Sequence, residues 1–395
     1  MLKFATRVQS LKSSSIMEIS AKAQELKAKG HDVISLAAGE PDFNTPEPIQ
    51  KAATQAMAEG ITRYTPAPGF LALRETIAQM VTQENGYEVS PEEVTIVSGA
   101  KHGIYLTLQC LVDPGEAILV PTPAWVSYSP MVELTGAHII PLPLFEEDGY
   151  RPNTDRWKGL AIPPNAKGII INSPNNPTGV TYSKEDLTRL VSWALQRNLW
   201  ILSDEIYEKL LYDGAQHTSV SALGPEAKNS TITVSGFSKS YSMTGWRLGW
   251  TIAPKEFSKK LGALQSQSNS HTTSFVQWAA MTAAKLPSSI LEGMVKEFDS
   301  RRIYCMKRLD SLSDYLTYVR PNGAFYIFIN LSRFLTKKKM SDTDFAKALL
   351  EQEYLGVVPG SSFGKENCMR ISYATSLKNL EKAFDRLEVF LKKHS

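Results

Sequence analysis

The chain has 395 residues, and its 43 Lys and Arg against 40 Asp and Glu give a formal net charge of +3. Hydrophobic residues make up 43% of the sequence and charged residues 21%, while the 24 Gly and 22 Pro are spread throughout it; this balance excludes a disordered, collagen-like or coiled-coil chain. Because the net charge is close to neutral, there is no electrostatic reason to expect nucleic acid or an anionic membrane surface as a partner.

The first predicted elements lie before residue 50. The stretch 19–29 is rich in Ala, Lys, Glu and Leu and is followed by Gly30, which predicts a helix that ends there. Residues 39–48 contain several prolines and predict an irregular crossing into a new unit. At roughly 100–200 residues per domain, the length of the chain favours two domains.

Between about residues 90 and 254, short β-branched runs alternate with helical patterns. One such pattern is 184–197, where apolar residues recur at helical spacing. Strands interleaved with helices predict a mostly parallel sheet covered by helices on both faces. The predicted strands are 94–97, 117–120, 139–141, 168–172, 200–203, 231–235 and 248–252.

After about residue 290 the pattern changes to an α+β section, which we expect to pack with the N-terminal helix as a second, smaller domain. We place the large domain at 46–288 and assemble the small domain from 1–45 and 289–395. The predicted elements of this section are a helix over 291–312, a strand over 324–330, a helix over 342–353, a strand over 369–373 and a closing helix over 377–392.

Three cysteines, Cys110, Cys305 and Cys368, are odd in number and lack the spacing of metal ligands. They therefore argue against a disulfide framework and favour a reducing compartment. The N-terminus lacks an apolar signal core, and no apolar run approaches the roughly 18–20 residues that span a bilayer. We expect a cytoplasmic protein with no metal site and no membrane or nucleic-acid partner.

Polar and glycine residues at the predicted strand ends are the first candidates for function, because ligands bind beyond the carboxyl ends of parallel strands. Strand 94–97 ends in Ser98-Gly99-Ala100-Lys101, directly before a helical pattern. Small residues at such a point let backbone N–H groups approach an anion. Tight packing explains them equally well.

Two further strands end in polar residues. Strand 168–172 runs into seven turn-forming residues, 173–179, which either form an ordinary turn or aim an amide into a site. Strand 200–203 is followed by Asp204. A carboxylate after a buried apolar run needs a cationic partner, either a structural Arg or Lys or a protonated cofactor nitrogen.

Lys239 lies in a loop rich in Ser and Gly after strand 231–235, eight residues before Arg247. Most lysines are solvated at the surface. At a strand end, however, Lys239 is a candidate for a desolvated amine that forms an imine, with Arg247 and Ser238 close enough to bind a phosphate.

Nine segments in order resemble the fold type I pyridoxal-phosphate enzymes, specifically the class I aminotransferases and within them the bacterial aspartate aminotransferase branch. The resemblance covers nearly the whole chain and implies an α/β fold, with a mostly parallel seven-stranded sheet in a large domain that binds pyridoxal 5'-phosphate and a smaller α+β domain. The segments are AAGEPDF, RYTPAPG, SGAK, PAWVSY, NSPNNPTG, SDEIYE, SKSYSMTGWRLG, GAFY and RISYA.

The resemblance assigns catalytic roles to three residues. Lys239 would bind the cofactor aldehyde covalently and, once released by substrate, would move a proton between Cα and the cofactor. Asp204 would pair with the protonated pyridine nitrogen. Tyr207, together with Asn176, would donate hydrogen bonds to the 3'-oxygen of the ring.

Other residues would hold the cofactor. The resemblance places Trp125 against the ring face and brings Tyr64 to the phosphate of a neighbouring subunit, which implies a homodimer with shared active sites. Many relatives have a serine where this chain has Gly236, so one phosphate-binding hydroxyl is missing. The residues expected at the phosphate are Gly99, Ala100, Lys101, Ser238 and Arg247.

The same resemblance predicts the substrate site. Arg370 would bind the α-carboxylate bidentately, and Gly39 would lie beside that carboxylate, where Trp125 and Asn176 also contact the substrate. Lys101 is the candidate for a distal carboxylate, because no arginine occurs between Arg247 and Arg301. Ile16 stands where the branch commonly has a small hydroxyl residue, which weakens the expectation of aspartate as the donor.

The function implied is transfer of the amino group of L-aspartate to 2-oxoglutarate by a ping-pong mechanism, which gives oxaloacetate and L-glutamate. Ile16 and the aromatic side chains around Trp125 and Tyr128 keep open an aromatic amino acid or prephenate aminotransferase. A carbon–sulfur β-lyase on the same fold is a further alternative, since fold does not fix reaction. No G-x-G-x-x-G follows a predicted strand, which argues against a nicotinamide enzyme.

Overall fold

The computed structural model describes residues 2–9, 11 and 15–394, without the side chains of residues 15–17 and 20. Two helices open the chain, α1 (Thr6–Gln9) and α2 (Ser15–Ala28), and a short strand β1 (Ile34–Ser35) follows them. Gly30 after α2 has a φ of +89°, a left-handed conformation that stops the helix where the sequence predicts. None of the described helices has the length and apolar character needed to cross a membrane.

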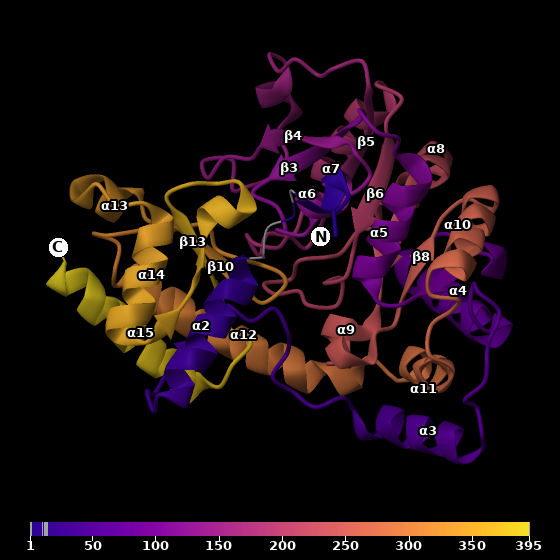
Figure 1. Cartoon of the computed structure of the whole chain (residues 1–395), viewed down its shortest axis with the longest axis horizontal. Helices are drawn as coiled ribbons and strands as arrows, with labels where there is room; N and C mark the ends of the chain where they lie inside the picture. Colours follow the sequence, from indigo (N-terminus) through magenta and orange to yellow (C-terminus); the bar gives the residue numbers. More distant parts are fainter. Residues whose placement is uncertain (1, 10, 12–14, 395) are drawn as a thin grey trace.

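A seven-stranded sheet forms the centre of the larger part of the molecule (Figure 1). Its strand order is β2-β8-β7-β6-β5-β3-β4, and only β8 runs antiparallel to its neighbours. The predicted mostly parallel sheet is therefore confirmed. The strands are β2 (Val94–Val97), β3 (Ala117–Thr122), β4 (His138–Pro143), β5 (Ala166–Asn172), β6 (Trp200–Asp204), β7 (Thr231–Ser235) and β8 (Gly249–Ile252).

Helices cover both faces of this sheet, because strand residues alternate in direction and both sets are apolar. On one face, Ile118, Ile170 and Leu202 pack with α5 (Ala100–Leu111) and α6 (Tyr128–Glu133). On the other face, Ile169 and Ile201 pack with α7 (Lys184–Leu195). The first turn of α7 is fixed by a capping box between Ser183 and Asp186.

The β2–β8 edge is buried by helices that the sequence analysis did not identify. These are α3 (Glu47–Ala58), α4 (Leu71–Asn85) and α11 (Ser274–Lys285), whose apolar side chains share one core with both strands. Helix α10 (Lys255–Ser268) lies alongside α5, and the short helices α8 (Pro225–Ser230) and α9 (Phe237–Ser240) flank β7.

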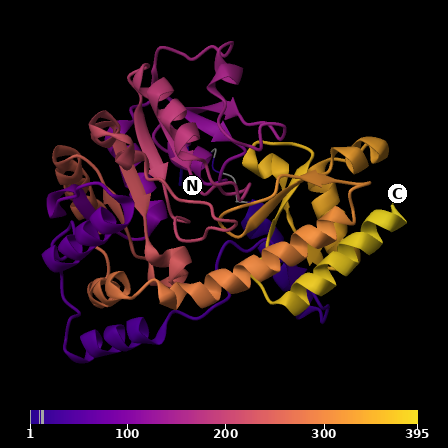
Figure 2. The ribbon, with the colours of Figure 1, turned by 180° about the vertical axis from the view of Figure 1, so that it is seen from behind.

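A second, antiparallel sheet has the strand order β12-β13-β10-β9. It shares a core with α12 and α15, and Figure 2 shows the long α12 running from beneath the large sheet to the side of α15. Its elements are β9 (Thr317–Tyr318), β10 (Tyr326–Asn330), β12 (Val358–Pro359), β13 (Cys368–Ser372), α12 (Ser289–Asp310), α13 (Ser332–Lys338), α14 (Asp342–Glu353) and α15 (Leu377–Lys393), while β11 (Leu355–Gly356) pairs with β1.

The predicted strands 94–97 and 231–235 match the structure, and each of the others differs from it by one or two residues at one or both ends. The strand expected over 324–330 begins at Tyr326, because Ala324 has a φ of +55°, which is incompatible with a strand. The strand expected over 369–373 lies one residue earlier, at Cys368–Ser372. The domain boundaries 46–288 and 1–45 with 289–395 stay a prediction.

Candidate active site

A cavity of about 320 Å³ lies where the loops after β2, β5, β6 and β7 meet β10 and β13. Most residues predicted for the site line it, although they are distant in sequence. This is the placement expected for loops at the carboxyl ends of parallel strands. The lining residues are Gly39, Ala100, Lys101, Ile104, Trp125, Asn172, Asn176, Asp204, Ile206, Tyr207, Ser238, Lys239, Thr244, Arg247, Tyr326 and Arg370.

Lys239 extends into this cavity from the short helix α9, directly after β7. Its Nζ donates a hydrogen bond of 2.5 Å to the backbone carbonyl of Gly39. Burial lowers the pKa of the Lys239 amine to about 8, an effect that Glu40 opposes. A sizeable fraction of the amine is therefore unprotonated near neutral pH, as a nucleophile requires.

Asp204 ends β6 and is 4% exposed. Its Oδ2 accepts a 2.7 Å hydrogen bond from the Tyr128 hydroxyl, and its Oδ1 accepts one of 3.3 Å from the Ile206 N–H. Burial raises the pKa of Asp204 to about 6. No Lys, Arg or His in the described ranges forms a salt bridge with it, so this buried carboxylate lacks the cation that would stabilise its charged form.

Arg370 is a buried cation that likewise has no partner of opposite charge among the described residues. It lies on β13 with 1% exposure, and its guanidinium donates to Asn176 Oδ1 at 3.0 Å and to the Ala37 carbonyl at 2.6 Å. Its Nε has no hydrogen-bond partner and no described carboxylate pairs with it, while burial lowers its pKa. The guanidinium also stacks on Tyr326 at 4.4 Å. A planar cation held in this way fits a carboxylate.

An anion-binding site lies at the first turn of α5. Gly99, before α5, has a φ of +84°, and a Cβ there would come within 2.4 Å of Arg247 Nη2, so glycine allows the guanidinium to approach the helix N-terminus. Arg247 donates to the carbonyls of Thr244 (2.7 Å) and Ser98 (3.4 Å) and forms no salt bridge with a described carboxylate. With Ser238 it surrounds a position suited to a phosphate.

Hydrogen bonds tie the remaining polar residues of the cavity together. The hydroxyls of Tyr207 and Tyr326 lie 2.9 Å apart, and burial raises the pKa of both. Asn172 Nδ2 donates to the Asp204 carbonyl at 2.9 Å, and Asn172 Oδ1 accepts from the Asn176 N–H at 2.8 Å. The two strand ends are therefore held in one arrangement.

Lys101 and Trp125 lie next to each other in the lining of the cavity. Lys101 Nζ lies 4.9 Å from the centre of the Trp125 ring, a cation–π distance. Burial and the charge of Arg247 lower the pKa of Lys101. Within the described ranges no carboxylate forms a salt bridge with Lys101, so this cation remains available to a ligand.

Two predicted site residues, Tyr64 and Gly99, do not line the cavity. Tyr64 is 91% exposed and lies beside His271 in a separate surface pocket. Gly99 contacts Arg247 from behind and does not line the cavity. The side chain of Ile16 is outside the described part of the structure. At Gly236, a Cβ would lie 3.0 Å from the Gly249 Cα, so the backbone favours glycine there.

The sequence analysis assigned no site role to Asn172, Thr244 or Tyr326, which line the cavity, and did not predict the contact of Tyr128 with Asp204. Tyr326 lies in the segment GAFY, but no spacing signal distinguishes it from its aromatic neighbour Phe325. Asn172 is the last residue of β5, and its position at a strand end was the available signal. Their roles follow from contacts that connect residues more than 30 positions apart, such as Asn172 with Asp204 and Tyr326 with Tyr207.

Residues 31–387 match the family model described as aminotransferase class I and II. The chain is 42% identical to an aspartate aminotransferase of Bacillus subtilis, covering 100% of both chains, and 44% identical to one of Geobacillus stearothermophilus, covering 99% of both. It is 39% identical to the aspartate/prephenate aminotransferase of Thermus thermophilus, with 96% of each chain covered. The solved aspartate aminotransferase of Rhizobium meliloti superposes with a TM-score of 0.96 at 36% identity over 100% of both chains.

Proposed function

Because this chain belongs to the class I and II aminotransferases, we propose that it transfers the amino group of L-aspartate to 2-oxoglutarate with pyridoxal 5'-phosphate as cofactor. The products are oxaloacetate and L-glutamate, formed in two half-reactions of a ping-pong cycle. The observation that carries the proposal is one cavity holding Lys239, the unpaired carboxylate of Asp204 and the unpaired guanidinium of Arg370.

The residues of the cavity fit this cofactor. Asp204 needs a buried cation, and the protonated ring nitrogen of pyridoxal phosphate is one. Arg247, Ser238 and the N-terminus of α5 suit its phosphate. Pyridoxal phosphate, when bound, supplies an aldehyde for the amino group and an electron-withdrawing ring that stabilises negative charge at Cα.

The side chains then divide the work. Lys239 Nζ, with a pKa of about 8, holds the cofactor and afterwards moves the proton at Cα of the substrate. Tyr207 and Asn176 line the cavity and would donate hydrogen bonds to the ring oxygen, and Trp125 would pack against the ring. The lowered pKa of Lys239 is what allows one amine to serve as nucleophile and as base.

Two cations select the substrate. Arg370 binds the α-carboxylate, which gives its free Nε–H an acceptor, with Gly39 alongside. Lys101 binds the side-chain carboxylate from the other side of the cavity. A dicarboxylic amino acid satisfies both, and a neutral amino acid leaves Lys101 without a partner.

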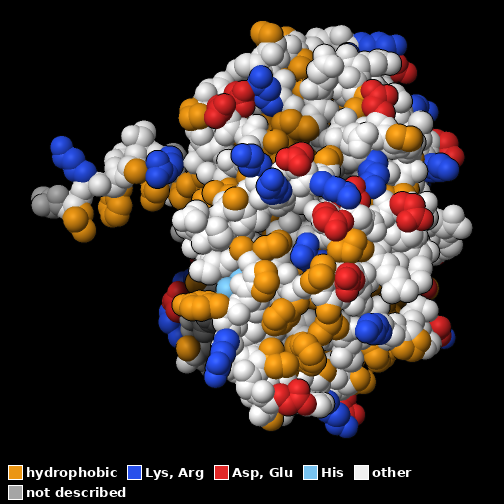
Figure 3. Space-filling model, turned by 90° about the vertical axis from the view of Figure 1, so that its right-hand side faces the viewer, with side chains coloured by type: hydrophobic (Ala, Val, Ile, Leu, Met, Phe, Trp, Pro, Cys, Tyr) orange, Lys and Arg blue, Asp and Glu red, His pale blue; other side chains and the backbone are white. Residues whose placement is uncertain are grey.

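The active form is a homodimer in this proposal. Tyr64 is 91% exposed and does not line this chain's cavity, which supports the proposal that it serves the phosphate site of the partner subunit. Exposed apolar side chains on α3, α4 and α11, namely Met57, Leu71 and Trp278, provide an apolar face near it. Figure 3 shows apolar side chains gathered on the lower part of the side of the molecule formed by these helices. The cytoplasmic location stays a prediction.

The test is a spectroscopic titration of the purified protein. With pyridoxal phosphate, borohydride reduction should attach the cofactor to Lys239, and aspartate should convert the visible absorption to that of the aminated cofactor, with 2-oxoglutarate restoring it. Lys239→Ala serves as the control and should abolish turnover. Attachment to another side chain, or no oxaloacetate from aspartate, would contradict the proposal.

An aromatic or prephenate substrate is a second candidate, because the Thermus thermophilus relative is named an aspartate/prephenate aminotransferase. Trp125 gives the cavity an aromatic surface, and the buried ring of Tyr128 packs edge to face against it at 5.3 Å. Initial rates with aspartate, tyrosine and prephenate at equal concentrations decide between the candidates. A rate with prephenate well above that with aspartate would favour the second.

A further inference from the structure

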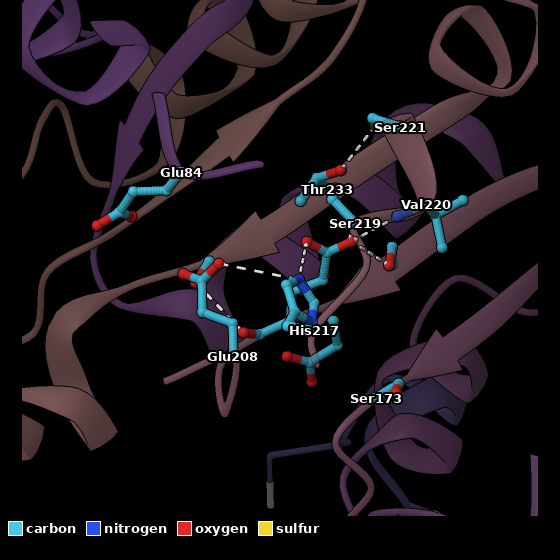
Figure 4. A network of polar contacts seen from close by, with 12 residues as sticks. Glu84, Ser173, Glu208, His217, Ser219, Val220, Ser221 and Thr233 are labelled. Atoms are coloured by element: carbon cyan, nitrogen blue, oxygen red, sulfur yellow. Dashed lines mark hydrogen bonds and ion pairs between the residues drawn. The ribbon is translucent and has the colours of Figure 1, made fainter. Parts of the chain in front are cut away.

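A buried ionic cluster lies directly behind the residues that would hold the cofactor. It consists of Glu205, Glu208 and His217, which we call the His217 cluster. Glu205 follows Asp204 in the chain and Glu208 follows Tyr207, whereas His217 comes from the loop before the 3₁₀ turn Val220–Leu223. Figure 4 shows the imidazole of His217 connected by a dashed line to the carboxylate of Glu208.

The imidazole connects the two carboxylates. His217 Nε2 is 3.1 Å from Glu205 Oε2 and 3.9 Å from Glu208 Oε2, and the three side chains are only 8%, 2% and 11% exposed, respectively. Two buried carboxylates that lie next to the same imidazole repel each other strongly unless a cation lies between them. His217 is the group placed to supply it.

Both carboxylates are also held by donors from other elements. Glu205 Oε1 accepts hydrogen bonds from the hydroxyls of Ser203 and Ser219 and from the Val220 N–H, at 2.7, 3.1 and 3.1 Å. Glu208 Oε1 accepts one of 2.9 Å from the Ser235 hydroxyl on β7. The cluster thus joins β6, β7 and the following loop.

The charges around His217 favour its protonated form. Burial lowers the pKa of His217, but the hydrogen bond to Glu205 and the charges of Glu205 and Glu208 outweigh this effect and raise it. Burial raises the pKa of Glu208. The other groups that face the cluster are Lys209, which pairs with Glu84 at 2.6 Å, and the buried hydroxyl of Tyr87.

We propose that His217 is a positioning residue: its imidazolium bridges Glu205 and Glu208 and so fixes residues 204–208 with Asp204 and Tyr207 facing the cavity. The backbone supports this, because the Glu205 N–H donates to the Val234 carbonyl and the Glu208 N–H to the Glu205 carbonyl. Asp204 and Tyr207 line the cavity, while the glutamates that follow them lie in the cluster. The inference rests on the proposed use of pyridoxal phosphate.

Removal of the imidazolium leaves two buried carboxylates without a cation. One of them then takes up a proton or draws in water, and residues 204–208 shift. A shift of this kind misplaces Asp204 against the ring nitrogen, which weakens cofactor binding and changes the proton affinity of the bound cofactor. Arg370 is on another element, so the Michaelis constant for the substrate should change less.

The experiment compares His217→Gln, the double variant with Glu208→Gln, and His31→Gln, a control at the surface that stacks on Tyr354. His217→Gln should weaken pyridoxal phosphate binding on the order of tenfold and shift the pH midpoint of its visible absorption by about half a unit. The double variant should recover part of the cofactor affinity and part of the pH midpoint, because it has one buried charge fewer. The control should match the unmodified protein.

A second measurement applies if His217→Gln does not fold. The ring nitrogen signals of His217 in the unmodified protein should report a doubly protonated imidazole at pH 7, and Glu208→Gln should lower its titration midpoint. A neutral ring at pH 7, or a folded His217→Gln variant with the cofactor affinity and midpoint of the unmodified protein, would overturn the inference. Failure of the unmodified protein to bind pyridoxal phosphate would instead reject the proposed function.

Discussion

At the scale of single residues, the cavity is defined by buried charges that lack partners. Asp204 and Arg370 are 4% and 1% exposed, and neither forms a salt bridge with a described side chain. Leaving an ion buried and unpaired lowers the stability of a fold. A protein keeps such groups where a ligand supplies the missing charge, so each residue allows a direct test.

The pH dependence of stability should reveal that Asp204 has no cationic partner in the protein without cofactor. Its pKa is about 6 in the folded protein against 3.8 for an ordinary Asp, so the folded state keeps a proton that the unfolded state loses. In protein without cofactor, this group stabilises the fold below pH 3.8, and that stabilisation is lost as the pH rises through 6. Asp204→Asn should therefore gain roughly 2.4 kcal/mol in free energy of unfolding, relative to the unmodified chain, between pH 4 and pH 7.

Denaturant unfolding of both proteins at the two pH values measures this difference, since all other titrating groups are common to them. Added pyridoxal phosphate should make the Asn variant the less stable of the two proteins, because the ring nitrogen then pairs with the carboxylate and the variant lacks that pairing. A difference that does not change with pH would mean that Asp204 is ionised and compensated in the unliganded protein.

Arg370 and Lys101, the two cations proposed to bind the substrate, should differ in which amino acids they affect. Arg370→Lys replaces a planar fork with a point charge, and we expect it to raise the Michaelis constant by about 10- to 100-fold for aspartate and alanine alike. Lys101→Met should raise that constant for aspartate only, because alanine has no side-chain carboxylate. Steady-state kinetics with both donors measures this. Equal effects of Lys101→Met on the two donors would exclude its role in specificity.

At the scale of elements, the turn between β2 and α5 requires glycine at position 99 for two reasons, its backbone conformation and its closeness to Arg247. Gly99→Ala would force a side chain into a φ of +84° and place its Cβ 2.4 Å from Arg247 Nη2. We expect a loss of stability of about 1–2 kcal/mol and, because Arg247 must move, a cofactor affinity at least roughly tenfold lower. Thermal unfolding and a cofactor titration measure the two effects.

Gly293→Ala is the matched control for that turn. Gly293 lies in α12 with open space around its Cα, so alanine should stabilise this helix by up to about 1 kcal/mol and leave cofactor affinity unchanged. If Gly99→Ala also left the affinity unchanged, Arg247 would not be a phosphate ligand.

The elements that build the large sheet could be predicted because local signals agree with the fold. All seven strands were found, since each is a short apolar run with β-branched residues, and several end in polar residues. The helices α3, α4 and α11 were not predicted. Many of their buried side chains are alanines, and their packing against the β2–β8 edge becomes visible only in the structure. Likewise Lys239 and Asp204 are found from strand ends, whereas Tyr326 depends on a contact between two sheets.

At the scale of the whole molecule, the described chain leaves apolar surface and one predicted site residue uncovered. Leu2 and Phe4, in the N-terminal segment that projects from the body in Figure 3, are 93% and 70% exposed, and Tyr64 is 91% exposed. Exposed apolar surface of this kind is typical of an interface. A second copy related by a two-fold axis would cover it on both subunits at once.

Mixed dimers provide the sharpest test of a shared site. Tyr64→Ala and Lys239→Ala should each lower activity, the first through cofactor affinity and the second completely. If Tyr64 acts on the partner's cavity, a dimer with one subunit of each kind has one site that carries both substitutions and one that carries neither. After random exchange of subunits in equal amounts, half of the dimers are mixed, so about a quarter of the sites should be intact.

Activity measured at limiting cofactor should rise to about that level, while each variant mixed with itself gains nothing. Sedimentation must show dimers in both samples. Activity that remains at the average of the two variants would mean that Tyr64 does not serve the neighbouring site.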